Sequence, residues 1–179
     1  MPEPELEKLK FPIGKFVFNP NADENEIRQW VSEIENLPLQ IRSAVKGLNE
    51  AQLNTPYRPG GWTVKQVVHH LADSHMNAYV RIKLALTENN PAIKAYSEKL
   101  WAEMDDAKNL PVESSLSLIE ALHARWAYLL KNLSSVDISK TMIHPERGEI
   151  SVKFILALYA WHGKHHCRHI ISLRERMKW

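Results

Sequence analysis

The chain has 179 residues, of which 44% are hydrophobic and 25% are charged, and its formal net charge at pH 7 is +2. This balance predicts one globular domain that buries a core without disulfides. A charge near zero, with no block of lysine or arginine, argues against nucleic acid and a membrane surface as partners. The opening MPEPELEKLK lacks the apolar run of a signal peptide, and Cys167 has no second cysteine to pair with. We therefore expect a soluble, cytoplasmic protein.

The first half of the chain predicts an extended arm and two long helices. Prolines and a glycine punctuate residues 1–20, which we expect to be an extended N-terminal arm. A helix follows near 23–48, and Pro38 either kinks it or divides it into two short helices. After the break TPYRPGG, Thr63 caps a second helix over 63–87.

The second half predicts two more long helices between irregular segments. Residues 88–111 have no regular period and predict a long loop with short helical turns, whereas 112–133 predict a third helix. Residues 134–150 form a second loop region with room for a small hairpin, and Ser151 caps a last helix to about 177. The fold class is therefore all-α: a four-helix bundle with long connecting loops, in one domain over residues 1–179.

Nine histidines are present, and they concentrate at 69–75 and 162–169. On the last helix the apolar row runs through Val152, Ile155, Tyr159, Ile170 and Leu173, and His162 and His166 fall on the same row. Residues i and i+4 of a helix differ by about 40° and about 6 Å of rise, so both rings can reach one point. The pattern suits two imidazoles on one metal ion; buried hydrogen-bonded histidines, or an exposed face, are the alternatives.

His70 is the candidate third ligand. It lies in VVHHLADSH on the second helix, one position from an apolar row that includes His75. Bundles build metal sites from inward residues of facing helices. Three histidines leave one position of a tetrahedral zinc ion open, as catalytic sites do, whereas a structural zinc would need a fourth ligand, for which His123 and His144 are spare candidates.

The neighbours of these histidines receive weaker assignments. His69 and His165 point about 100° away from the ligand rows, so we expect them to face solvent or to support the ligands from outside. His169 either lines the pocket or lies on the surface. Asp73 is placed to accept the second N–H of His70 or to act as a base, unless it only faces solvent. Cys167 is expected to be an inert thiol.

Apolar walls for a cleft beside the metal are offered by three tryptophans and by the two long loops, 88–111 and 134–150. The tryptophans are Trp62, Trp101 and Trp161, for which plain core packing is the alternative.

Three stretches together resemble the DinB-like superfamily and, within it, the YfiT type of bacterial protein. They are GGWTVKQVVHHLADSHMNAYVRIKLALTE, HPERGEI and the terminal pattern Y-x-W-H-x-x-H-H-x-x-H-I. The resemblance implies a four-helix bundle, a homodimer and one divalent metal, zinc or nickel, on three histidines. Carried over by motif, these are His70, His162 and His166.

The resemblance also implies an activity. Members of the family are described as metal-dependent hydrolases, and related members as thiol S-transferases that use bacillithiol or a similar small thiol. Three neutral imidazoles leave the charge of the metal uncompensated, which favours a hydroxide or a thiolate in the open position. We expect a hydrolase acting on a small molecule; a thiol S-transferase in detoxification and a non-catalytic metal-binding module are the alternatives.

Overall fold

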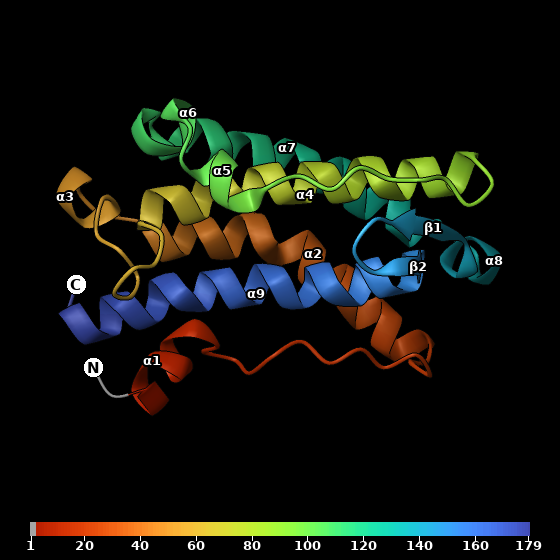
Figure 1. The fold of residues 1–179 in the computed structure, drawn as a ribbon, viewed down its shortest axis with the longest axis horizontal. Coiled ribbons are helices and arrows are strands. Elements are labelled where there is room, and N and C mark those ends of the chain that lie inside the picture. The colour runs from red at the N-terminus through yellow and green to blue at the C-terminus, as the bar shows by residue number, and fades with distance from the viewer. Residues whose placement is uncertain (1–2) are drawn as a thin grey trace.

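The computed structural model describes residues 3–179 and forms a four-helix bundle (Figure 1). The long helices are α2 (Glu24–Val45), α4 (Val64–Thr87), α7 (Val112–Lys131) and α9 (Val152–Met177). Their bounds confirm the four helices that the sequence predicts. The shorter elements are α1 (Glu3–Lys10), α3 (Glu50–Leu53), α5 (Glu98–Ala102), α6 (Asp105–Asn109), α8 (Ser135–Ser139), β1 (Thr141–His144) and β2 (Gly148–Ser151).

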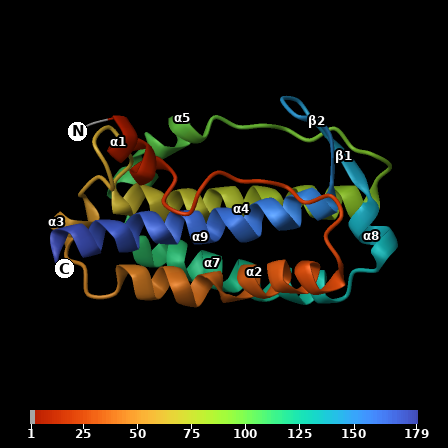
Figure 2. The ribbon, with the colours of Figure 1, turned by 90° about the horizontal axis from the view of Figure 1, so that it is seen from below.

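Consecutive helices do not all pack side by side. α2 packs against α7 and α9, and α4 packs against the same two helices, so α2 and α4 lie at opposite corners (Figures 1 and 2). The connection through α3 therefore crosses one end of the bundle. The segment 88–111 returns along the length of α4 before α7 begins, as the long predicted loop requires.

Side-chain caps fix where the helices begin. Thr63 accepts a hydrogen bond from the backbone of Gln66, and the Gln66 side chain accepts one from the backbone of Thr63, which makes a capping box at the start of α4. Ser151 caps α9 through the backbone N–H of Phe154. These caps set the phase of the two helices that carry the histidines.

Pro38 lies inside α2, which continues as one helix rather than two. A proline has no backbone N–H, so the carbonyl of Ile34, four residues earlier, loses its helical partner. That carbonyl instead accepts a hydrogen bond from Nδ1 of His123 on α7, at 2.6 Å. The interruption in α2 thus fixes a buried histidine of a neighbouring helix.

The core consists of two apolar clusters separated along the bundle. One gathers Leu37, Ile41, Leu71, Ile119 and Ile170 around the end where α4 begins. The other gathers Ile34, Ile82, Trp126, Met142 and Ile155 toward the hairpin end. Buried histidines of α4, α7 and α9 lie between them, so the core contains a polar layer.

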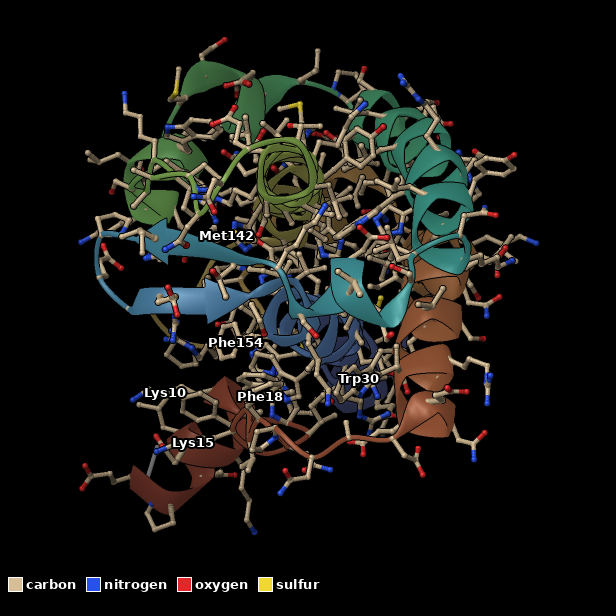
Figure 3. The ribbon with its side chains drawn as sticks, turned by 90° about the vertical axis from the view of Figure 1, so that its right-hand side faces the viewer. Lys10, Lys15, Phe18, Trp30, Met142 and Phe154 are labelled. Atoms are coloured by element: carbon tan, nitrogen blue, oxygen red, sulfur yellow. The ribbon has the colours of Figure 1, made fainter. Side chains whose placement is uncertain are left out.

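The N-terminal segment differs from its prediction. Residues 3–10, expected to be extended, form α1, because they contain good helix formers once Pro4 is in the first turn. From Phe11 to the start of α2 the chain has no regular secondary structure and runs along α9 (Figure 2). Phe18 packs edge-on against Phe154 of α9, with ring centroids 5.1 Å apart (Figure 3). The arm is therefore a cover over α9.

A small hairpin closes the end of the bundle opposite the termini (Figure 1). β1 and β2 pair antiparallel, with His144 opposite Gly148, and confirm the hairpin that the second loop has room for. The segment 91–93 lies beside β1, where the N–H of Ile93 donates to the carbonyl of Ile143 at 3.0 Å. Within residues 3–179, every helix is too short or too polar to cross a membrane.

Candidate metal centre

Three histidines from two helices meet in the polar layer. His70 comes from the second turn of α4, and His162 and His166 come from successive turns of α9. One ring nitrogen from each lies within 4.8 Å of the others. Nε2 of His70 and Nε2 of His162 are 3.2 Å apart. The structure thus brings together the three residues that helical spacing indicates.

The spacing of these nitrogens suits a tetrahedral ion. Two nitrogens that each lie about 2.0–2.1 Å from a zinc ion at the tetrahedral angle are about 3.3 Å apart. The 3.2 Å between the Nε2 atoms of His70 and His162 is close to that value. His70 and His166 are buried and His162 is partly buried.

The electrostatics keep all three rings neutral, which is the form that binds a metal. Burial lowers the pKa of His70 to about 4. Burial also holds the pKa values of His162 and His166 well below the ordinary range, and the neighbouring imidazoles lower them further. At neutral pH, protons therefore do not compete with a cation for these nitrogens.

A fourth histidine, His75, orients His162. Its Nε2 lies 3.2 Å from Nδ1 of His162, and its side chain is 0% exposed. If Nε2 of His162 bound a metal, its Nδ1 would carry the proton and donate a hydrogen bond to Nε2 of His75. His75 stacks in turn on His123, with ring centroids 5.0 Å apart. The sequence places His75 on the apolar row of α4 but assigns it no role. A histidine in an otherwise apolar row could have indicated that its side chain has a buried polar partner.

The first alternative for His69 and His165, that they face solvent, is wrong, because both side chains are buried. His69 is bonded through Nδ1 to the hydroxyl of Ser115 at 2.7 Å and through Nε2 to the carbonyl of Leu110 at 3.0 Å. His165 stacks on Trp161 at 4.3 Å. Segments distant in the chain cover both rings, and neither belongs to the group of three.

His169 is buried beside the site and does not lie on the surface. Its Nε2 donates to the carbonyl of Lys10, and its ring stacks on Tyr57 with centroids 3.9 Å apart. It therefore ties α9 to the N-terminal segment and to the loop before α4. His123 and His144 also lie outside the group of three, since His123 bonds to Ile34 and Nδ1 of His144 accepts from the backbone of Glu146.

Asp73 lies one turn beyond His70 and is half-buried. Burial, together with the charge of Asp106, raises the pKa of Asp73 to about 6. Among residues 3–179, no hydrogen bond joins its carboxylate to His70, so the expected contact with that ring is not formed. Cys167 packs in the apolar cluster, where burial raises the pKa of its thiol to about 12.

Of the three tryptophans expected to line the cleft, one contacts the rings of the candidate ligands and two contact other aromatic rings. Trp62 lies 4.6 Å from the ring of His70 and 6.3 Å from that of His166, measured between centroids. Trp161 lies against His165, and Trp101 lies against Tyr96 in the long loop. Trp62 is therefore the tryptophan that shields the ligand rings.

The chain is similar to known proteins over nearly its whole length. The model of the DinB superfamily matches residues 33–170. A protein of Oceanobacillus iheyensis is 57% identical over 170 residues, covering 95% of this chain and 98% of that protein, and one of Bacillus mycoides is 52% identical over 174 residues, covering 97% and 100%. Both are named "putative metal-dependent hydrolase".

Among solved structures, YfiT from Bacillus subtilis superposes with a TM-score of 0.93 at 43% identity, covering 96% of this chain and 99% of that chain. It is described as "a probable metal-dependent hydrolase with an unusual four-helix bundle topology".

Proposed function

Because the chain belongs to the DinB superfamily, we propose that it is a metal-dependent hydrolase of small molecules. In this proposal His70, His162 and His166 hold one divalent ion, zinc in the first instance and nickel as the second choice. The observation that carries the proposal is the convergence of three neutral histidine nitrogens within 4.8 Å in a buried layer. The names of the relatives support the hydrolytic reaction.

The residues of the site favour a reactive centre over a structural one. Three imidazoles close three positions of a tetrahedral ion, and His123 and His144, the spare fourth ligands, are occupied elsewhere. When bound, a divalent ion supplies Lewis acidity and lowers the pKa of water toward 7. His75 holds the His162 ring in the orientation that presents Nε2 to the ion.

Asp73 is the proposed general base. A base works best when its pKa lies near the operating pH, and the value of about 6 for Asp73 meets that condition. It follows His70 by three residues on α4 and is not one of the three proposed ligands. Asp73→Asn should therefore lower turnover while the affinity for zinc stays the same.

The test measures zinc binding first and turnover second. His70→Ala, His162→Ala and His166→Ala should each weaken zinc binding at least about 100-fold in a chelator competition, since removing even a supporting partner of a ligand costs 10–100-fold. His165→Ala is the matched control, because it removes a neighbouring buried imidazole outside the group. A full equivalent of tightly bound zinc in His162→Ala would contradict the proposed ligands.

Turnover is then measured with panels of esters and amides and with a thiol-conjugation assay, on protein with and without zinc. Zinc-dependent hydrolysis supports the proposal. Conjugation of a small thiol without hydrolysis would assign the site to S-transfer instead. Tight zinc binding with no turnover in any panel would favour a non-catalytic metal-binding module.

A further inference from the structure

Arg81 is a buried arginine that forms no ion pair within the described part of the chain, although its positive charge lowers the pKa of Glu98 against the effect of burial. It lies on α4 and is 9% exposed. Its Nη2 donates to the carbonyl of Lys94 at 2.8 Å, whereas its Nε is buried and has no hydrogen-bond partner. Among residues 3–179, no carboxylate lies within ion-pair distance of its guanidinium.

The fold does not account for this charge. An arginine stays protonated at any physiological pH, and burying an unpaired cation costs free energy. Holding the carbonyl of Lys94 uses one of five N–H groups, and a neutral amide side chain would do the same work. A guanidinium fork matches the two oxygens of a carboxylate or a phosphate, which is the use that remains for it.

Arg81 faces the same way along α4 as the candidate ligand. Eleven residues separate it from His70, close to three full turns, so the two side chains share one face at a rise of about 16 Å. Ser74 lies on this face between them, and its hydroxyl donates to Tyr159 at 3.2 Å. The Tyr159 ring is 5.4 Å from that of His162. A polar stripe thus leads from the histidines to Arg81.

The positive charge of Arg81 affects the pKa values of two groups near this stripe. Burial raises the pKa of Tyr159, while Ser74 and the positive charge of Arg81 act in the opposite sense. Burial lowers the pKa of His144 on β1, and Arg81 lowers it further. The guanidinium therefore lies near the segment around Lys94 and near β1 of the hairpin.

Tyr96, in the segment that follows α4, brings a buried hydroxyl close to Ser74, whose hydroxyl lowers the pKa of Tyr96 against the effect of burial. Nε of Arg81 is buried and has no hydrogen-bond partner. That unsatisfied donor indicates that the partner it lacks comes from outside the chain.

We propose that Arg81 binds a carboxylate or phosphate group of the substrate while the reacting bond lies at the histidine cluster. The inference rests on the proposed function and adds the substrate class: an elongated anion, with about 16 Å between its charged end and the bond that reacts, given the rise along α4. Hydroxyl groups of the substrate would face Tyr96 and Ser74.

The test measures anion binding directly, so that it does not depend on turnover. Inorganic phosphate and succinate are titrated calorimetrically into metal-free and zinc-loaded protein at constant ionic strength, with chloride as the reference anion. Arg81→Gln keeps a donor for the carbonyl of Lys94 but removes the charge, and Arg81→Lys keeps the charge but loses the fork. Lys83→Met is the matched control, because it removes one exposed positive charge from the same helix.

Arg81→Gln should weaken binding of the preferred anion at least tenfold, Arg81→Lys less so, and Lys83→Met should bind as the unchanged protein does. Tighter binding of phosphate or of succinate identifies which group the substrate carries. The proposal is overturned if neither anion binds the unchanged protein better than chloride, or if all variants bind equally. Binding that appears only with zinc and ignores Arg81 also overturns it. Failure of zinc binding alone would refute the proposed function and leave Arg81-dependent binding to metal-free protein intact.

Discussion

Acid should destabilise the metal-free protein through its buried histidines, and His123 gives the clearest measure of this effect. Its side chain is 1% exposed, and its Nδ1–H donates to the carbonyl that Pro38 frees in α2. Burial lowers the pKa of His123 to about 4, although the bond to Ile34 acts to raise it. The unfolded chain has the ordinary value of about 6.5.

The sign follows from proton binding. Below pH 6.5 the unfolded chain takes up a proton at this residue that the folded protein does not, so stability is complete above pH 6.5 and falls as the pH drops toward 4. Between pH 7.5 and pH 5 the loss from this one ring is about 2 kcal/mol. A domain of this size has a total stability of roughly 5–15 kcal/mol, so a few such rings bring acid unfolding close to pH 5.

His123→Asn isolates the effect, since an asparagine amide can donate to the Ile34 carbonyl but does not titrate. Urea unfolding of the metal-free proteins is measured from pH 7.5 to pH 5. The free energy of unfolding of the variant should differ from that of the unchanged protein at pH 7.5. At pH 5 the unchanged protein should have lost about 2 kcal/mol more than the variant. Ile119→Val, a buried change in the same helix, controls for lost packing and should run parallel to the unchanged protein. Parallel curves for His123→Asn as well would refute the lowered pKa.

Three further predictions concern single side chains. His75→Leu should raise the zinc dissociation constant 10–100-fold by removing the acceptor of His162, with rescue by His75→Gln; equal affinities would show that His75 does not orient the ring. Gly163→Ala should cost about 1–3 kcal/mol in urea unfolding, because the new Cβ would lie 2.9 Å from both methyl groups of buried Leu37; full stability would mean that α2 moves away freely. Cys167 should react with iodoacetamide at least about 100-fold more slowly than in the unfolded chain, since burial raises its pKa to about 12; similar rates would contradict this.

The helices and the histidine cluster could be predicted because both depend on local periodicity. Caps at Thr63 and Ser151 fix the start of α4 and α9, and a spacing of four residues then places His162 and His166 on one inward row. Placing these two histidines on one row needs no information about other parts of the chain. His70 lies one position from the apolar row of α4, so its assignment relied on the resemblance to the DinB-like superfamily and on the packing of α4 against α9.

The surroundings of the cluster could not be predicted because they depend on segments far away in the chain. His69 is buried by Leu110 and Ser115, and His165 is buried by Phe11 and Trp161. Of these four, only Trp161 lies on the same helix as its histidine, so a helical projection shows only that contact. A helix looks exposed on such a projection wherever a loop or an arm later covers it. The buried state of Arg81 follows in the same way from the segment around Lys94.

A chain of contacts that ends at the candidate metal centre begins at Pro38 in α2. Pro38 frees the carbonyl of Ile34, His123 takes it, and His75 packs between His123 and His162. This layer of neutral rings is costly to bury, because several of their nitrogens have no partner in the protein. A bound metal would offset that cost, adding about 4 kcal/mol of stability at a thousand times its dissociation constant. Metal binding and folding should therefore be coupled, with acid removing the metal and the fold over the same pH range.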